Sequence, residues 1–293
     1  MKRISLLLCA LAVAEISFAQ DPTEIYLFDL SIKKEKVSIS NPVNISDHKG
    51  YDNQPSFHPA QPAVFFSSAA DDGRTDIFSY DYKKKVKKSI TQTQEREYSP
   101  TVTLDQQSLS CIIQRENGAQ DLGKYPIEGG EPMVIIDKLT VGYHVWADNS
   151  HLGLFILGTK EKPVNTLHYL LLPMKRDTIL AENIGRSLHK IPGETAFSFV
   201  HKISDKEWLI KKFNSQTQAI STITSTLPGR DDLAWLPDGK IIMSDGTKLF
   251  FSQPDRGTTW SEVVVSGGAE VLRSVTRIAV SADGKKLAVV VAE

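Results

Sequence analysis

The sequence predicts an all-β protein, a six-bladed β-propeller whose ring is closed by half-blades from the two ends of the chain. The first observation is a series of short apolar strands, such as 64–68, 152–157, 208–210, 241–243 and 287–291, separated by Gly, Pro, Asn and Asp. The second is that no segment keeps the 3.6-residue apolar period of a helix. The third is a short phrase that recurs along the chain at a nearly constant spacing.

The recurring phrase is an apolar residue, one spacer, then Pro-Asp-Gly or a degraded form of it, and then an apolar strand. It is clearest at Trp235 to Gly239 and at Val280 to Gly284. The first residues of the copies, which we call anchors, are separated by 45, 44, 43, 46 and 45 residues: Phe57, Val102, Trp146, His189, Trp235 and Val280. A period in the mid-forties with about four strands per unit is typical of propeller blades.

The unit around Trp235 illustrates one blade. We expect its four strands at 233–235, 240–243, 248–252 and 261–265, with a turn over 255–260 between the third and the fourth. That turn resembles the Asp-box of sialidase-type propellers, with Gln253 where a Ser is usual. The resemblance implies a turn that stabilises a hairpin and a Trp260 ring that packs inward, and it implies no sialidase chemistry.

The two ends of the chain predict how the ring closes. Residues 23–30 match residues 75–82 almost position by position, and 75–82 has the place of a third strand. The chain therefore begins with third and fourth strands (24–30 and 36–44) and ends with first and second strands (276–280 and 285–292). The two half-blades should join into one sheet, which hides two strand edges.

The first residues have the features of an export signal. Lys2 and Arg3 precede an apolar run over 4–14, and Ser17-Phe18-Ala19 offers small residues at the −3 and −1 positions of a cleavage site. We expect a signal peptide at 1–19 and a propeller at 20–293, and hence a periplasmic or secreted protein. An uncleaved anchor or a buried strand is the weaker interpretation, because the run is too short to span a bilayer.

The charge balance and the cysteine count limit which partners and cross-links the protein can have. The chain has 34 basic and 35 acidic residues, a formal net charge of −1, which disfavours nucleic acid because phosphate binding needs a basic excess. No other apolar run is long enough for a membrane span. Cleavage leaves Cys111 as the remaining cysteine, so we expect no internal disulfide and a buried, inert thiol. We also expect a monomer.

One blade carries a family resemblance. Its segments 55–59 (PSFHP), 64–68 (VFFSS) and 71–78 (DDGRTDIF) are similar to the WD-repeat-like propeller of the TolB family. The resemblance covers the mature chain at the level of the blade pattern. It implies a six-bladed propeller fold, which occurs in binding proteins, enzymes and peptidase accessory domains. Full TolB proteins also carry an N-terminal α/β domain, which we expect to be missing here.

Candidate site residues stand three positions before each anchor, where the innermost strands begin. All six are polar or amphipathic: Gln54, Ser99, Tyr143, Arg186, Asp232 and Arg277. Together with His144 they form the predicted ligand-binding set at the channel mouth. Two arginines beside a Tyr and an Asp suit an anionic or hydroxyl-rich ligand. The alternative is that these side chains satisfy one another and channel water. His144 and His189 are either ligands or a general base, or packed strand residues.

Three functions fit these observations. The first is an exported binding or interaction module for an envelope protein or a small polar or anionic ligand. The second is an enzyme that acts on a small carbohydrate, lactone or peptide-like molecule in the channel. The third is a structural subunit of an envelope complex. The sequence contains no nucleophile elbow, His-Glu-x-x-His motif, phosphate loop or paired cysteines. We therefore expect no metal or cofactor and assign no catalytic residue.

Overall fold

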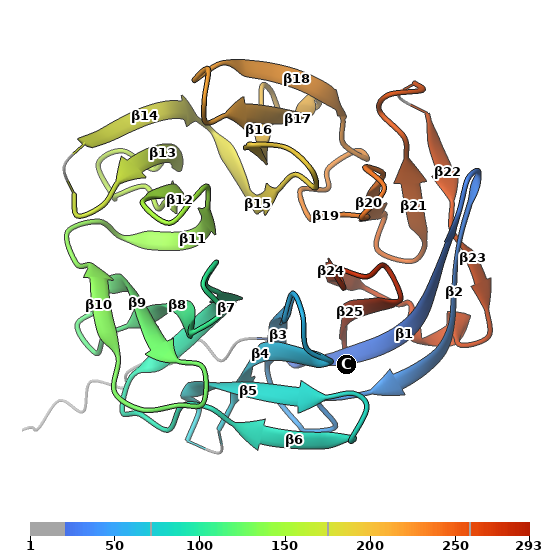
Figure 1. Cartoon of the computed structure of the whole chain (residues 1–293), viewed down its shortest axis with the longest axis horizontal. Coiled ribbons are helices and arrows are strands. Elements are labelled where there is room, and N and C mark those ends of the chain that lie inside the picture. The colour runs from blue at the N-terminus through green and yellow to red at the C-terminus, as the bar shows by residue number, and fades with distance from the viewer. Residues whose placement is uncertain (1–20, 71, 175, 258) are drawn as a thin grey trace, which may run out of the picture.

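The chain forms a ring of six β-sheets around a central channel (Figure 1). The structure is a computed structural model that describes residues 21–70, 72–174, 176–257 and 259–293. The proposed signal peptide lies outside these described residues. Apart from one 3-10 turn at Ala269–Val271, the described elements are all strands. The predicted fold class, a six-bladed β-propeller, is confirmed.

Five blades are four-stranded antiparallel sheets in which chain order runs from the channel outward (Figure 1). Blade 1 is β3 (Asp52–Phe57), β4 (Ala63–Ala69), β5 (Thr75–Asp81) and β6 (Val86–Ser89). Blade 2 is β7 (Arg96–Val102), β8 (Ser108–Gln114), β9 (Gln120–Pro126) and β10 (Met133–Ile136). Blade 3 is β11 (Val141–Trp146), β12 (His151–Ile156), β13 (Thr166–Leu171) and β14 (Arg176–Glu182). Blade 4 is β15 (Ile184–Lys190), β16 (Ala196–Lys202), β17 (Trp208–Asn214) and β18 (Ile220–Ser225). Blade 5 is β19 (Leu233–Trp235), β20 (Ile241–Ser244), β21 (Leu249–Ser252) and β22 (Trp260–Glu262).

The sixth sheet, the closing blade, joins the two ends of the chain. Its strands are β24 (Val275–Val280), β25 (Lys286–Ala292), β1 (Thr23–Lys33) and β2 (Lys36–Asn44), in that order from the channel outward. β1 pairs antiparallel with β25 from Thr23 opposite Ala292 to Asp29 opposite Lys286. The predicted half-blades therefore meet as expected, and the first and last described strands lie side by side in Figure 1.

One strand differs from the prediction. The segment expected as a single fourth strand of blade 5, 261–265, is divided between two sheets. β22 pairs with β21, whereas β23 (Val264–Ser266) runs parallel to β2 as a fifth strand of the closing blade. Between them, Val263 is 2% exposed and packs in the core that the two blades share, which holds the crossover in place. The predicted inward packing of Trp260 is partly realised, because its half-buried ring packs on the core between blades 4 and 5.

The hydrophobic core consists of six clusters, one at each interface between neighbouring blades. Since each sheet is packed on both faces, the five middle residues of the second strand are all buried in β4, β8 and β25. Two anchors link blades through a polar bond. The indole of Trp146 donates to the Ser110 hydroxyl of blade 2 over 2.9 Å, and that of Trp235 donates to Ser198 of blade 4 over 2.9 Å.

The turn after each anchor explains the recurring phrase. In the copy at Val280, the Asp283 carboxylate accepts the Lys285 backbone N–H over 3.1 Å, and Gly284 has a φ of 67°, where side chains with a Cβ are strained. In the copy at Val102, Asp105 accepts the Gln107 N–H over 3.0 Å. The phrase therefore encodes the tight turn from the first strand of a blade into the second.

Candidate functional site

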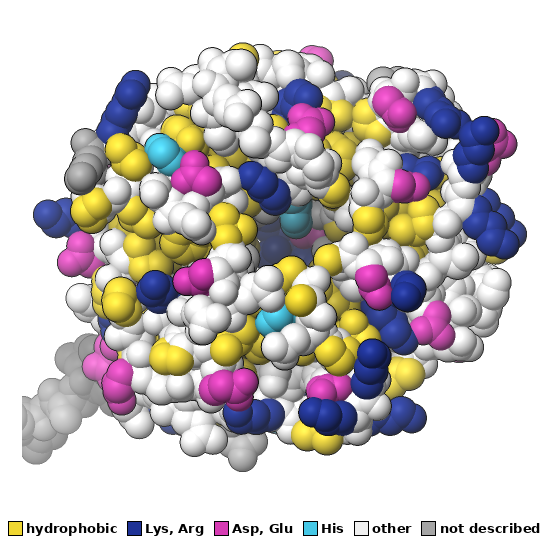
Figure 2. All heavy atoms as spheres, in the orientation of Figure 1, with side chains coloured by type: hydrophobic (Ala, Val, Ile, Leu, Met, Phe, Trp, Pro, Cys, Tyr) yellow, Lys and Arg dark blue, Asp and Glu magenta, His cyan; other side chains and the backbone are white. Residues whose placement is uncertain are grey.

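A cavity of about 770 Å³ occupies the middle of the ring, and all seven predicted site residues line it. We call it the central cavity. Its lining runs from the start of the inner strands (Gln54, Tyr143, Arg277) to the hairpins at their far ends (Pro59, Pro192). Figure 2 shows the centre of this face hollowed, with basic, acidic and histidine side chains deep inside. The predicted residues therefore form the inner end of a funnel, and the wide opening lies beyond the anchors.

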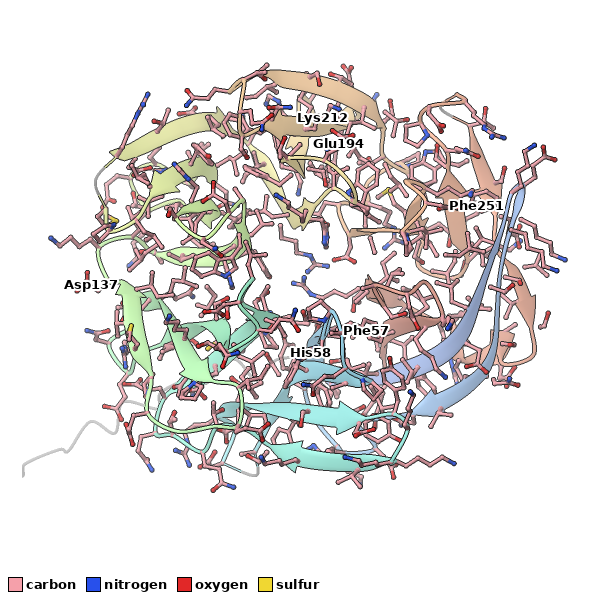
Figure 3. All side chains as sticks on the ribbon, viewed as in Figure 1. Phe57, His58, Asp137, Glu194, Lys212 and Phe251 are labelled. Atoms are coloured by element: carbon pink, nitrogen blue, oxygen red, sulfur yellow. The ribbon has the colours of Figure 1, made fainter. Side chains whose placement is uncertain are left out.

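Irregular backbone at the start of the inner strands directs these side chains. The pairing between first and second strands shifts register in five blades: after Asn53, Tyr98, Val141, Ile184 and Val275. Gln54 and Ser99 sit in two of these bulges with positive φ values of 57° and 55°. A bulge inserts an extra residue and turns a side chain out of the regular alternation. Figure 3 shows side chains that project from the inner strands into the ring, with Phe57 labelled near the end of β3.

A hydrogen bond spans the channel between opposite blades. The Arg277 Nη2 of the closing blade donates to the Tyr143 hydroxyl of blade 3 over 2.7 Å, and the guanidinium lies 4.9 Å from the centre of the Tyr143 ring. These two blades stand three positions apart in the six-membered ring. We call this pair the cross-channel bar. It anchors a positive charge in the middle of the channel, with 12% of the Arg277 side chain exposed.

Asp232, which precedes the first strand of blade 5, contacts Arg277 of the closing blade. One carboxylate oxygen, Oδ1, accepts the backbone N–H of Ile278 over 2.9 Å, and Oδ2 lies 3.6 Å from the Arg277 Nη1. Burial raises the pKa of Asp232 to about 6, and the nearby Arg277 and Arg186 oppose the rise. Burial outweighs the attraction of the arginines, so this carboxyl titrates closer to neutrality than an ordinary aspartate.

Arg186 supplies a second, more accessible cation. Its Nη2 donates to the backbone oxygen of Thr276 over 2.9 Å, and its Nε lies 3.6 Å from Asp231. The side chain remains 36% exposed. Adjacent residues Asp231 and Asp232 therefore contact different cations, as the alternation of side chains along a strand predicts.

Gln54 and Ser99 come from blades 1 and 2, which lie between the closing blade and blade 3. The Gln54 Oε1 accepts both the Ser67 hydroxyl, over 3.0 Å, and the backbone N–H of Ser99, over 2.8 Å. The bond from Ser99 links blades 1 and 2, and the two bonds together satisfy the Gln54 oxygen. The structure thus links Tyr143, Asp232 and Arg277, with Arg186 at their edge, whereas Gln54 and Ser99 are bonded to each other in the same cavity.

Both channel histidines belong to the wall. His144 is 6% exposed, and its Nε2 lies 2.7 Å from the Ser110 hydroxyl. The Nε2 of His189 lies 2.8 Å from the Ser187 hydroxyl. Burial lowers the pKa of each ring to about 4, and for His189 the charge of Arg277 lowers it further. Each ring is therefore neutral at pH 7 and bonded to a serine, which matches the packed alternative in the sequence analysis.

Two neighbours of the cluster were missed by the sequence analysis. The Lys202 ammonium lies 3.0 Å from Asp231 and 4.0 Å from the centre of the Trp208 ring. Both residues come from the second and third strands of blade 4, whereas the sequence search followed the first strands. Within the described part of the chain, no group of three or more His, Cys, Asp or Glu side chains is arranged to hold a metal ion. The same residues include no helix with the length and apolar character to cross a membrane.

These features define a six-bladed propeller with a polar, arginine-containing channel. Solved structures with the same fold show which proteins this chain resembles. The chain superimposes on a candidate TolB from Agrobacterium tumefaciens with a TM-score of 0.67 at 13% identity, covering 94% of this chain and 99% of the other. TolB from Acinetobacter baumannii gives a TM-score of 0.56 at 11% identity, covering 92% of this chain and 63% of the other. The chain therefore has a TolB-like propeller fold.

Enzymes share the same fold. A gluconolactonase from Xanthomonas campestris superimposes with a TM-score of 0.63 at 10% identity, covering 95% of this chain and 99% of the other. An oligogalacturonate lyase in complex with manganese gives 0.58 at 15% identity, covering 88% and 83%. No protein-family model and no curated protein matches the sequence. At these identities the likeness defines the fold and leaves function to the chemistry of the channel.

Proposed function

We propose that this chain is an exported binding protein that takes an anionic, hydroxyl-rich group, from a small molecule or an envelope protein, into its central cavity. The observation that carries the proposal is the cross-channel bar with Arg186 beside it, at the inner end of a cavity of about 770 Å³. Cavities of this size commonly hold small ligands, with a few polar groups that fix the ligand's orientation.

The electrostatics of the cavity favour an anion. Two guanidinium groups, from Arg186 and Arg277, face Asp232, whose pKa is raised to about 6 by burial. The wall histidines are neutral at pH 7 because burial holds their pKa values near 4. Arg186 keeps about a third of its side chain exposed and so offers donors to a ligand. Arginine binds carboxylates through paired N–H groups, which gives both affinity and orientation.

Three features support binding over catalysis. The two serines in the Ser–His contacts of the wall are almost fully buried, Ser110 at 0% and Ser187 at 2% exposed, so neither hydroxyl is accessible as a nucleophile. The Tyr143 hydroxyl is engaged by Arg277. The candidate export signal and the TolB-like fold support an envelope location, and TolB-type propellers are among the proteins with this fold.

Thermal unfolding with a panel of small acids, each paired with its uncharged amide or alcohol, tests the proposal. A ligand present at a hundred times its Kd stabilises a folded protein by about 2.7 kcal/mol. In a chain of this size that corresponds to a rise in Tm of about 4–5 °C. We expect one or more acids to raise the Tm of the wild type and their uncharged partners to leave it unchanged.

The variant Arg186→Ala/Arg277→Ala should lose this stabilisation. Arg256→Ala/Arg273→Ala is the matched control, since both residues are exposed and neither lines the central cavity. Circular dichroism reports whether the first variant folds, and Arg186→Ala alone serves if it does not, because Arg186 is the less buried of the two. Acids that stabilise the Arg186→Ala protein as much as the wild type would refute the proposed site.

A second candidate is an enzyme that acts on a small carbohydrate or lactone. The observation in its favour is Asp232, whose raised pKa of about 6 suits a general base or acid near neutral pH. Two proteins of the same fold are named as a gluconolactonase and an oligogalacturonate lyase. Hydrolysis of a lactone by the wild type that falls at least a hundredfold in Asp232→Asn would favour the enzyme over the binding protein.

A further inference from the structure

A second cavity, of about 330 Å³, lies on the other side of the cross-channel bar. It shares Arg186, Asp232, Arg277 and Ile278 with the central cavity. The rest of its lining comes from where first strands begin (Gly229–Asp231, Val275 and Thr276) and from the turn region between second and third strands (Lys202, Trp208 and Ser244). Since strands alternate in direction within a blade, all these segments lie on one face of the ring, opposite the wide end of the central cavity.

Positive charge exceeds negative charge around this second cavity. Four cationic side chains line it, Arg186, Lys202, Arg230 and Arg277, against two carboxylates, Asp231 and Asp232. Asp231 lies between Lys202 and Arg186, at 3.0 and 3.6 Å, and Asp232 faces Arg277 at 3.6 Å. With both carboxylates ionised, two positive charges remain in excess, although the whole chain carries a formal net charge of −1.

The cations are held in place and accessible. The Lys202 ammonium is fixed between Asp231 and the Trp208 ring, 4.0 Å from the ring centre, and 31% of its side chain is exposed. Arg230 is exposed, and its guanidinium donates to the backbone oxygen of Asp245. A preorganised donor loses less conformational entropy when it binds an anion than a free surface lysine does.

Two polar groups at the second cavity make no hydrogen bond to the described part of the protein. The Arg186 Nε and the Thr276 hydroxyl are buried and have no hydrogen-bond partner within the described structure, although the Nε lies 3.6 Å from the Asp231 carboxylate. These two residues are in direct contact, because the Arg186 Nη2 donates to the Thr276 backbone oxygen. Buried polar groups without a partner are uncommon and costly in folded proteins. Both residues line the second cavity.

We propose that the second cavity is a separate binding site for a small organic carboxylate. Arg186, Lys202 and Arg230 bind the carboxylate oxygens, and Trp208, Val275 and Ile278 receive the apolar body of the ligand. The volume admits a single small ring or short chain. The site goes beyond the proposed function, because Lys202, Trp208 and Arg230 do not line the central cavity.

The test is an NMR titration that follows the indole N–H of Trp208, one of four tryptophans and assigned through Trp208→Phe. The probes are cyclohexanecarboxylate, its uncharged twin cyclohexanecarboxamide, and inorganic phosphate. We expect saturable shifts of the Trp208 signal with the carboxylate, and at least tenfold weaker binding of the amide and of phosphate. The amide lacks the charge that the cations bind, and phosphate lacks the apolar body.

The variant Lys202→Met/Arg230→Gln should weaken binding of the carboxylate at least tenfold. Lys206→Met/Arg273→Gln is the matched control, with the same change in net charge at exposed residues outside both cavities, and it should bind like the wild type. Arg230→Gln alone replaces the double variant if that protein does not fold. Equal binding of carboxylate and amide, equal binding of phosphate, or an unchanged affinity in the variant would each overturn the second site. None of these outcomes decides the central cavity, because the variant keeps Arg186 and Arg277 and neither Lys202 nor Arg230 lines that cavity.

Discussion

Replacing His144 with glutamine tests the account of the channel wall. Burial lowers the pKa of this ring from 6.5 to about 4 in the folded protein. The unfolded chain therefore binds more protons than the folded one between pH 6.5 and pH 4, so His144 makes stability fall as the pH falls through this range. The full loss is about 3 kcal/mol at 1.36 kcal/mol per pKa unit, and about 2 kcal/mol of it is reached by pH 5.

Urea unfolding at pH 7.5 and at pH 5 measures this contribution. The amide of glutamine can occupy the place of Nε2 and bond the Ser110 hydroxyl, yet it does not titrate. Groups such as His189, whose pKa is also about 4, remain in both proteins and cancel in the comparison. We expect the wild type to lose about 2 kcal/mol more than His144→Gln between the two pH values. Equal losses in the two proteins would refute the buried, uncharged His144.

Three further predictions concern the ring. A chain that ends at Gly284 lacks β25 and its five buried apolar side chains. Burial of the four larger ones, Leu287, Val289, Val290 and Val291, stabilises by about 6–12 kcal/mol, comparable to the whole stability of a domain. The truncated chain should fail to form a monomeric ring in gel filtration and circular dichroism, and a soluble product with the wild-type Tm would contradict ring closure by the two ends. Ser110→Ala removes the partner of both the His144 Nε2 and the Trp146 indole. Urea unfolding should therefore show a free energy of unfolding that is lower by about 2–4 kcal/mol. An unchanged free energy would mean that the bonds between blades 2 and 3 contribute little. The Cys111 thiol is fully buried and its pKa is raised well above the ordinary value by burial and by Glu97, so it should react with Ellman's reagent only in denaturant; rapid reaction of the native protein would contradict its burial.

The fold could be predicted from the sequence because each blade repeats the same local solution. The Asp-Gly turn at Asp283 and Gly284 and the apolar second strands mark the period directly. Closure by the two ends followed from the likeness of 23–30 to a third strand. The division of 261–265 between two sheets could not be predicted, since β23 pairs with a strand more than two hundred residues away and no local signal marks the crossover at Val263.

The site could be predicted only as a set of positions. Periodicity placed six polar residues around the channel, His144 was added as a neighbour of Tyr143, and all seven line the central cavity. It did not indicate that Arg277 reaches Tyr143 across the ring, because that bond depends on the diameter of the channel and the lengths of two side chains. Lys202 and Trp208 could not be predicted from positions relative to the anchors, because they belong to the second and third strands of blade 4 and line the second cavity.

A crystal structure of the protein with an acid that raises its Tm tests the central claim most directly. We predict an anionic group in the central cavity within hydrogen-bond distance of the Arg186 or Arg277 guanidinium, with Tyr143 and Asp232 beside it. An acid that stabilises the protein but binds outside the central cavity, with only ordered water at Arg186 and Arg277, would contradict the account.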